Sequence, residues 1–413
     1  MTSAALPKPP PNLFEHVPRI TGETMSLFID FHAIQAVPPS NINRDEDGSP
    51  KSTVFGGTRR ARVSSQAWKR AMRHDFDSHL DQTELGVRTL RMIDQIAARI
   101  TDRDPSIVGE AAEKLAVDVL TASGIKVEKV KPRKSDPDQT EYSKTGALLF
   151  LSNPQIDALA DLAVRSEGKV EKKEAKAVLN RGNSIDLALF GRMVADAPDV
   201  NVDAAAQVAH AIGTHTVVPE FDYFTAVDDK QSEDNAGAGM IGTVEFNTAT
   251  LYRYATVNVS LLQENLGSAD ASARGVEAFA RAFIRSMPTG KRNTFANKTL
   301  PSFVLATVRT DEPINFAAAF EEAVEPVQAQ HRPARAAGTD PVKLEGSLTQ
   351  RSITALVDEA QRVYESFDAA PESAYVLSTK YVDGLDDFAQ AVSISELVSA
   401  LGDKVRDQLD SRQ

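Results

Sequence analysis

The basic residues between Lys51 and Arg73 are the side chains of this sequence best suited to binding chemistry. The segment KSTVFGGTRRARVSSQAWKRAMR holds seven basic residues and no acidic one, whereas the whole chain carries a formal net charge of -12. Lys and Arg form charge-assisted hydrogen bonds to phosphates and carboxylates. Most charged runs are solvated surface, but the lack of any interleaved acidic residue in an acidic chain favours a local anionic partner.

The spacing of these residues predicts a strand followed by a helix. After a Gly-Gly turn, RRARVS alternates, which places Arg60 and Arg62 on one face of a strand. Ser64 or Ser65 can then cap the N-terminus of a helix over QAWKRAMRHDF.

The predicted helix has one polar and basic face, formed by residues with i, i+3, i+4, i+7 spacing: Gln66, Lys69, Arg70 and Arg73. Trp68, Ala71 and Met72 fall on the opposite face and are expected to pack in a core. A strand edge, a helix N-terminus and a basic stripe can together follow a phosphate backbone. No GxxxxGK(S/T) motif is present, which argues against a nucleotide cradle.

Composition places the chain among ordinary globular proteins. Its 413 residues are 42% hydrophobic and 25% charged. The absence of cysteine excludes disulfides, thiolate metal sites and cysteine nucleophiles, and suits a cytoplasmic protein. No apolar run reaches the length of a membrane span, and the N-terminus lacks a secretory signal pattern. We therefore expect a cytoplasmic location and no membrane partner.

Several acidic and histidine residues are candidates for a catalytic or metal site, but their spacing does not support one. Asp45, Glu46 and Asp47, with Asp30 and His32, suggest a metal-dependent nuclease centre, but no spaced partner motif supports ligation. A solvated acidic turn beside a strand residue facing water is favoured. His210 and His215 are five apart and do not share one helix face, and no GxSxG elbow is present. We expect no metal, no cofactor and no catalytic residue.

The remaining pattern predicts an α+β fold. Helices are predicted over residues 85–100, 106–122 with an end at Gly124, 153 onward, 171–180, 203–212 and 271–287. Strands are predicted in SLFIDFHAIQAV, SIDLALFGRM, residues 243–246 and 251–259, SFVLATV and AYVLST, with an exposed loop over 126–144 and a basic loop TGKRNTFANKTLP. This order suits an antiparallel sheet with helices on one face, as in a split βαβ, ferredoxin-like fold. The RNP1 octapeptide is absent, so the usual sheet-face base stacking is not supported.

Residues 216–242 show no regular pattern, and an irregular segment of this length is usually functional. Phe221, Tyr223 and Phe224 lie in it. They either anchor the segment to the protein's own core or stack against bases, an interaction worth ~1–3 kcal/mol per base. Composition alone leaves the two alternatives equal.

Several motifs in one order resemble the CasC backbone subunit of the type I-E CRISPR Cascade complex. They are FIDFHAIQAVPPSNINRDEDGSPKSTVFGGTRRARVSSQAWKRAMR, SIDLALFGRM, HAIGTHTVVPEFDYFTAVDD and TLYRYATVNVSLLQENLG. The similarity runs from about Met25 to near the C-terminus. The basic block and the HAIGTHTVVPEFDYFTAVDD block are highly specific when they occur together.

The resemblance implies a non-catalytic, hand-shaped protein with an RRM-like palm, helical fingers and a thumb loop. Copies would stack as a helical filament along CRISPR RNA, beside the other Cascade subunits. The thumb would kink the guide periodically, and the bases between kinks would pair with target DNA. The implied parts are a disordered Pro-rich extension at 1–24, palm at 25–75, 183–215 and 243–413, fingers at 76–182 and thumb at 216–242.

The resemblance also carries RNA-binding roles onto particular residues. The guide backbone would be held by Arg44, Lys51, Arg59, Arg60, Ser64, Gln66, Lys69, Arg70 and Arg73, with Met193 against the bases and Tyr223, Phe224 and Thr225 at the thumb tip. Thr58 stands where the family pattern has Lys, and Tyr223 where it has Trp. The fingers segment 126–144 matches poorly.

Two rival functions remain open from the residues. Related type III backbone subunits cut target RNA through an Asp in a palm loop, so Asp45 or Asp47 is a candidate for the same chemistry. A generic single-strand RNA-binding protein is the other, and it would bind RNA without forming an ordered filament.

Overall fold

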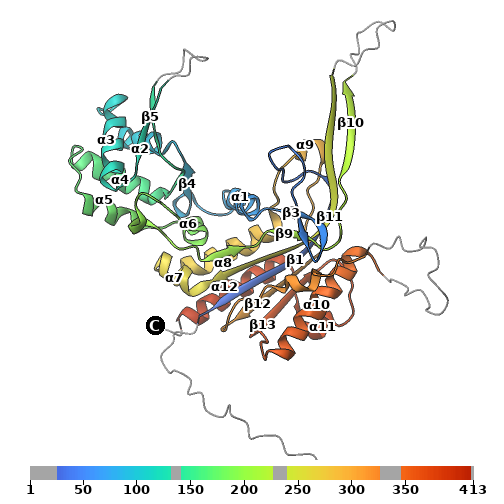
Figure 1. Cartoon of the computed structure of the whole chain (residues 1–413). Helices are drawn as coiled ribbons and strands as arrows, with labels where there is room; N and C mark the ends of the chain where they lie inside the picture. Colours follow the sequence, from blue (N-terminus) through green and yellow to red (C-terminus); the bar gives the residue numbers. More distant parts are fainter. Residues whose placement is uncertain (1–25, 132–140, 227–239, 326–345, 411–413) are drawn as a thin grey trace, which may run out of the picture.

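A central sheet of ten strands organises the molecule (Figure 1). The computed structural model describes residues 26–131, 141–226, 240–325 and 346–410. The strands are β1 (Phe28–Ser40), β2 (Ser52–Phe55), β3 (Thr58–Val63), β8 (Ala206–Val208), β9 (Ala211–Gly213), β10 (Glu220–Ala226), β11 (Met240–Asn258), β12 (Phe303–Arg309), β13 (Ser373–Ser378) and β14 (Gln390–Ala391). Their order is β14-β13-β12-β1-β11-β9-β3-β2, and β8 and β10 also pair with β11.

Strand β1 lies at the centre of this sheet, antiparallel to β11 on one side and to β12 on the other. Its alternation is as predicted, because Leu27, Ile29, Phe31 and Ala33 all enter one hydrophobic core. That core is closed by α1 (Ser65–Phe76), α6 (Ile185–Phe190), α7 (Val259–Leu266), α8 (Ala269–Arg285) and α12 (Ile394–Asp410).

Helices also cover the second face of the sheet, so the expectation of helices on one face was wrong. Ile34 of β1 packs there against Phe316 and Ile353. The covering elements are the 3-10 helix η4 (Phe316–Phe320), α10 (Leu348–Ser366) and the short α11 (Leu385–Phe388). Strand β1 is therefore buried on both faces, including its polar residues Asp30, His32 and Gln35.

Asp30 and His32 lie under this second cover, not in water as expected. Asp30 accepts hydrogen bonds from the Tyr254 hydroxyl at 3.1 Å and the Ile314 N–H at 2.9 Å. Burial raises the pKa of Asp30 to about 6. The His32 Nδ1 lies 3.0 Å from the Tyr252 hydroxyl, and burial lowers the pKa of His32 to about 3. These groups form a polar layer inside the protein, remote from the acidic turn at 45–47.

A second unit, the helical lobe, lies to one side of the sheet and has its own core. It comprises η1 (Gln82–Glu84), β4 (Gly86–Thr89), α2 (Met92–Arg103), α3 (Glu110–Ala122), β5 (Val127–Val130), β6 (Tyr142–Thr145), β7 (Leu149–Ser152), α4 (Asn153–Arg165) and α5 (Lys172–Leu179). The predicted helices are present, although the first begins at Met92 because β4 pairs with β7. Gly124 follows α3 with φ of 91° and ends that helix, as expected. The segment 126–144 contains the β5–β6 hairpin instead of a plain loop.

Two further segments adopt a different structure from the one predicted. SIDLALFGRM forms helix α6, in which Ile185, Leu187 and Leu189 are all buried. A short apolar run buried on every side gives no usable periodicity. Residues 203–212 are Ala-rich and were expected to be helical, but they form β8 and β9, which pair with the long strand β11. Tertiary pairing overrides local helix propensity there.

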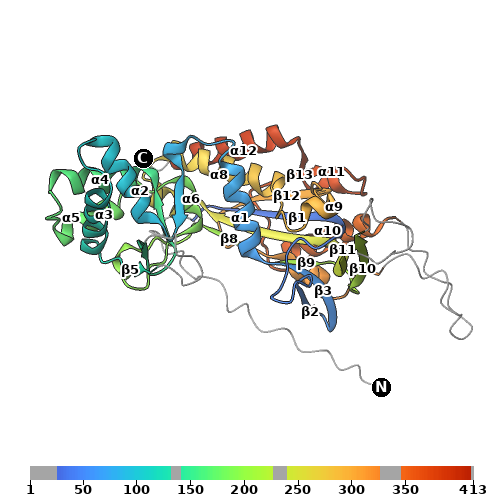
Figure 2. The ribbon, with the colours of Figure 1, turned by 90° about the horizontal axis from the view of Figure 1, so that it is seen from above.

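The described parts of residues 216–242 contain strands that the sequence pattern did not predict. β10 and the start of β11 form a hairpin that projects from the sheet, while the rest of β11 runs back through the sheet centre (Figure 1). β11 is therefore one strand of 19 residues instead of two separate strands. Figure 2 shows α1 between the helical lobe and this projecting hairpin. Residues 1–24 and the hairpin tip at 227–239 lie outside the described residues, so the predictions made for them stay predictions. Among the described helices, none has the length and apolarity needed to cross a membrane.

Replacement of His32 by Phe is expected to weaken the acid sensitivity of folding. The folded-state pKa of His32 is about 3, below the ordinary 6.5, so the unfolded chain takes up a proton first as the pH falls. The wild type should therefore lose about 2 kcal/mol between pH 6.5 and 5 through this residue, and the variant should not. Asp30 contributes in the opposite direction, because its raised pKa favours the folded state below pH 6, but it is common to both proteins.

Urea unfolding of both proteins at pH 7 and pH 5 measures this difference. The variant also lacks the hydrogen bond to Tyr252, which lowers its stability at both pH values alike. An identical pH dependence in the two proteins would contradict a neutral buried imidazole.

Candidate nucleic-acid interface

Helix α1 carries most of the predicted binding residues, and its local structure is as expected. The Ser64 hydroxyl accepts a hydrogen bond from the Ala67 N–H at 3.3 Å and caps the helix. Trp68 and Met72 are buried on the inner face, as predicted, and Phe76 joins them. The polar face with Gln66 and Lys69 is therefore turned outward.

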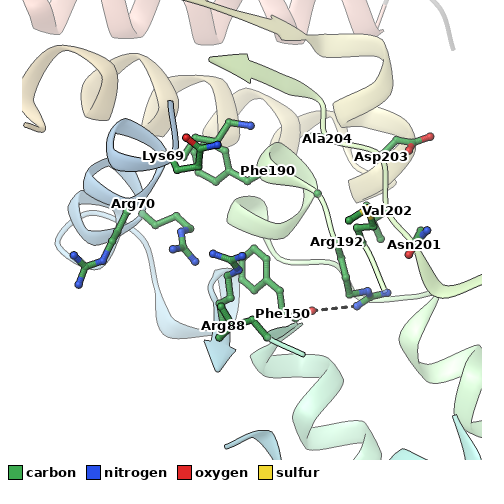
Figure 3. Close-up of a pocket in the computed structure, with 15 residues that line it drawn as sticks. Lys69, Arg70, Arg88, Phe150, Phe190, Arg192, Asn201, Val202, Asp203 and Ala204 are labelled. Atoms are coloured by element: carbon green, nitrogen blue, oxygen red, sulfur yellow. Dashed lines mark hydrogen bonds between the residues drawn. The ribbon is translucent and has the colours of Figure 1, made fainter. Parts of the chain in front are cut away.

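A groove of about 680 Å³ runs along this outer face (Figure 3). One wall is the face of α1, with the predicted residues Gln66, Lys69, Arg70 and Arg73. The opposite walls come from the helical lobe and from the segment after α6, with Arg88, Leu148, Phe150, Phe190, Gly191, Arg192, Met193, Asn201, Val202, Asp203 and Ala204. The structure thus brings Met193 to the predicted helix, although about 120 residues separate them in sequence.

Aromatic rings hold the cations of the groove in place. The Lys69 Nζ lies 5.9 Å from the Phe190 ring centre, and the Arg73 Cζ lies 5.6 Å from that of Phe150. Arg88 is the cross-strand partner of Phe150 and lies beside it (Figure 3). Cations within about 6 Å of a ring face are attracted to it. No ion pair joins these cations to any carboxylate of the described residues.

Burial is the main electrostatic perturbation in the groove. It lowers the pKa of Lys69, and together with the charge of Arg88 it lowers the pKa of Arg73. Partly desolvated cations that form no direct ion pair within the described residues gain from an incoming anion, although the charges of Asp186 and Asp77 oppose the lowering of the Arg73 pKa. The groove can therefore hold phosphate groups while the exposed Met193 offers an apolar contact.

Arg192 fixes the backbone that presents Met193. Its guanidinium is buried and donates to Val200 O at 2.8 Å, Leu179 O at 2.7 Å and Gln155 Oε1 at 3.0 Å. Met193 itself is 84% exposed. An exposed apolar side chain on a rigid segment is suited to contacting a partner.

Arg60 departs from the prediction, because it is fully buried. It donates to Gly213 O and Thr214 O at 3.2 Å each, to Glu321 O at 3.1 Å and to the Thr58 hydroxyl at 2.7 Å. Its donors are thus used to join three segments of the protein. Arg60 is a structural residue here and does not face a ligand.

The other basic residues before α1 lie outside the groove. Arg44 and Arg59 are exposed, on the loop before β2 and on β3 respectively. Lys51 is half-buried near His210, whose pKa is lowered by burial and by the charges of Arg62 and Lys51. The His210 Nδ1 accepts a hydrogen bond from the Ser65 N–H at 3.0 Å, which joins this cluster to the start of α1.

The aromatic residues of the projecting hairpin are divided between two roles. Phe221 and Tyr223 are 69% and 63% exposed on one face, and Thr225 continues it. Phe224 points to the other face and covers Gly242, where an added Cβ would lie 2.4 Å from its ring. Phe224 therefore packs within the hairpin, while Phe221 and Tyr223 are free to contact a partner. None of the four lines the groove.

Sequence reasoning missed Arg88, Phe150 and Phe190. Each lies in an ordinary apolar or strand segment, and only the packing of the lobe against α1 brings them to the groove. No local signal in the sequence distinguishes them. Asp45 closes a turn by accepting from the Asp47 and Ser49 N–H groups at 3.0 Å. Within the described residues, no cluster of three His, Asp or Glu side chains could hold a metal ion.

Comparison with known proteins identifies the family. The model of a family described as CT1975-like protein matches residues 29–339, which is most of the chain. The chain belongs to the CT1975-like family. No curated protein matches it.

Two solved structures resemble this CT1975-like chain over nearly its whole length. One is described as "CRISPR RNA-guided surveillance complex, pre-nicking": the match is 35% identical, covers 91% of this chain and 100% of that chain, and has a TM-score of 0.73. The other, a "CRISPR RNA-guided surveillance complex", is 31% identical over 90% of this chain and 99% of that chain, with a TM-score of 0.65.

Replacement of Arg60 by Met should destabilise the CT1975-like protein by about 3 kcal/mol, because the carbonyl groups of Gly213, Thr214 and Glu321 each lose the hydrogen bond from its guanidinium, although Thr214 O keeps that from the Val324 N–H. The matched variant Arg59→Met removes the same charge from an exposed neighbour and should cost about 0.5 kcal/mol at most. Denaturant unfolding of both variants measures the difference. Equal destabilisation would show that Arg60 is not the structural arginine of the pair.

Proposed function

We propose that this CT1975-like protein is a CasC-type backbone subunit of a type I-E Cascade complex that binds CRISPR RNA. The observation that carries the proposal is the groove that Met193, exposed, lines together with Lys69, Arg73 and Arg88, which form no ion pair within the described residues. The cations would hold successive phosphates of the guide, and Met193 would contact its bases. Contacts of this kind do not depend on base sequence.

The fold supports this assignment. The order β12-β1-β11-β9, with α1 and α8 on one face, matches the strand order of a split βαβ, ferredoxin-like palm. The helical lobe would then be the fingers, and the β10–β11 hairpin would be the thumb. Resemblance to chains of two CRISPR RNA-guided surveillance complexes supports CRISPR RNA and other Cascade subunits as partners. Further copies of this chain are part of the proposal.

The hairpin would act on the RNA held by a neighbouring copy in a filament. Phe221 and Tyr223 form an exposed aromatic face far from the chain's own groove. Stacking of Tyr223 against a base would displace that base and kink the guide at regular intervals. The bases between kinks would remain available for pairing with target DNA.

We propose no catalytic activity for the subunit. Asp45 and Asp47, the candidates for the rival nuclease function, lie on an exposed turn whose carboxylate contact is with its own backbone. Cutting of target RNA at fixed intervals by the assembled complex in Mg²⁺, abolished by Asp45→Ala replacement, would overturn this assignment.

Replacement of both Lys69 and Arg73 by Ala should weaken RNA binding alike for guides of different sequence. If each cation holds one phosphate, the log–log salt dependence should fall by roughly 0.7 for each phosphate that is no longer held. Fluorescence anisotropy with two unrelated RNAs over a salt series measures both effects. Lys172→Ala/Lys173→Ala on α5 removes the same charge from an exposed site in the lobe and should leave the slope unchanged. A Lys69/Arg73 variant that keeps the wild-type slope argues against backbone contacts at the groove.

Replacement of Tyr223 by Ala should change the periodic chemical reactivity of the guide in the assembled complex, because the base would have no stacking partner. The expected cost is ~1–3 kcal/mol per stacked base. Glu220→Ala, on the same strand but on the face with Phe224, is the matched control and should preserve the pattern. An unaltered reactivity pattern in the Tyr223 variant would remove the kinking role.

A further inference from the structure

A second basic segment lies outside the groove. From Arg281 to Lys298 the sequence RAFIRSMPTGKRNTFANK holds five basic residues and no acidic one. It covers the end of α8 and the basic loop that contains the short helix α9 (Arg292–Phe295). In a chain of net charge -12, such a segment again indicates an anionic partner.

Three of these basic residues line a pocket of about 180 Å³ beside α1. The pocket lies between the end of α8, the basic loop, a face of α1 that carries Ala71 and His74, and Ser78 just after that helix. This is a different face from that of Lys69 and Arg73. Helix α1 therefore has a cationic concavity on each flank.

The charges of the pocket are not neutralised within the described residues. Arg285, Arg292 and Lys298 are exposed and form no ion pair there. One carboxylate, Asp75, also lines the pocket, and its Oδ2 lies 3.7 Å from the His79 Nε2. Three cations against one carboxylate leave the pocket positive. Three buried atoms of the lining residues, Asp75 Oδ2, Ser286 Oγ and Asn297 Oδ1, have no hydrogen-bond partner among the described residues.

The basic loop is held in a costly conformation. Lys291 and Ala296, at either end of α9, have φ of 49° and 47°, which side chains other than Gly rarely adopt. The Asn297 Nδ2 donates to Gly290 O at 3.3 Å, and a Cβ at Gly290 would lie 2.3 Å from Ile42 O. A strained and tightly packed loop that carries cations is pre-organised for a ligand.

The loop also lies at the base of the projecting hairpin. The Phe295 ring centre is 5.8 Å from that of Phe246, the last β11 residue paired with β10. A strand of nucleic acid that leaves the groove across α1 towards the hairpin would pass this pocket.

From this geometry we infer a second phosphate-binding site, in which Arg285, Arg292 and Lys298 hold a phosphodiester of the nucleic-acid strand that crosses α1. The inference rests on the proposed function, because the groove supplies the strand. Its chemistry is shared by guide RNA and target DNA, and the experiment below distinguishes them.

The test compares three double variants of the full chain. Arg292→Gln/Lys298→Gln alters the pocket, Lys69→Gln/Arg73→Gln alters the groove, and Lys172→Gln/Lys173→Gln removes equal charge from the lobe. Binding of labelled single-stranded RNA, and of DNA with the same sequence, is measured by anisotropy over a salt series. Thermal unfolding checks that the three variants remain folded.

The pocket variant should lower the RNA salt slope by roughly 1.4, at roughly 0.7 for each phosphate that its cations no longer neutralise. This change in slope corresponds to roughly 25-fold weaker binding in 0.1 M salt, if the plots of log binding constant against log salt concentration for the variant and the wild type meet at 1 M. The same weakening confined to DNA would support the site and assign it to the target strand. A pocket variant that binds both probes like the lobe control overturns the second site, while weaker binding by the groove variant keeps the proposed function intact. If neither variant differs from the lobe control, both proposals fail.

Discussion

The guanidinium of Arg253 on β11 is the interaction on which the arrangement of the interface depends. It lies between two rings, 3.7 Å from the centre of Trp68 on α1 and 4.4 Å from that of Phe283 on α8. It donates to Gln35 Oε1 on β1 at 2.8 Å and to Phe283 O. Gln35 in turn donates to Thr299 at the end of the basic loop. One buried cation therefore fixes α1, the sheet and the basic loop relative to each other.

Burial of this cation without a carboxylate has an energetic consequence. Desolvation lowers the pKa of Arg253 to about 9, yet the group remains charged near neutral pH. Desolvating a charge is costly unless hydrogen bonds and ring faces replace the water that is removed. Arg60 and Arg192 are buried in the same way, with oxygen partners that carry no formal charge. Arg253 lies against Trp68 of α1 and Arg192 lines the groove, so their positive charge adds to that of the exposed side chains there.

Local patterns in the sequence were sufficient to predict α1, a serine cap at Ser64 or Ser65, and its outward face, because all three depend on residues within a few turns; the structure selects Ser64 as the cap. Arg60 could not be assigned in this way. Its carbonyl partners lie 153, 154 and 261 residues further along the chain, so only the assembled sheet determines that it is buried. The same limit applies to Arg88, which reaches the groove through the packing of the lobe. Residues 203–212 have a helical sequence pattern, but in the fold they form strands that pair with the long strand β11.

Strand β11 also determines the mechanics of the projecting hairpin. It pairs with β10 over Met240–Phe246 and with β1 over Asn247–Asn258. The stretch 243–258, which includes the junction of these two parts, contains no Gly or Pro. At ~3.4 Å per residue, its 19 residues span roughly 60 Å. β11 continues without a break where the arm leaves the sheet, while β1 opposite it shifts register between Val37 and Ser40. One strand therefore joins the arm to the core, and the length of that strand sets how far the arm reaches.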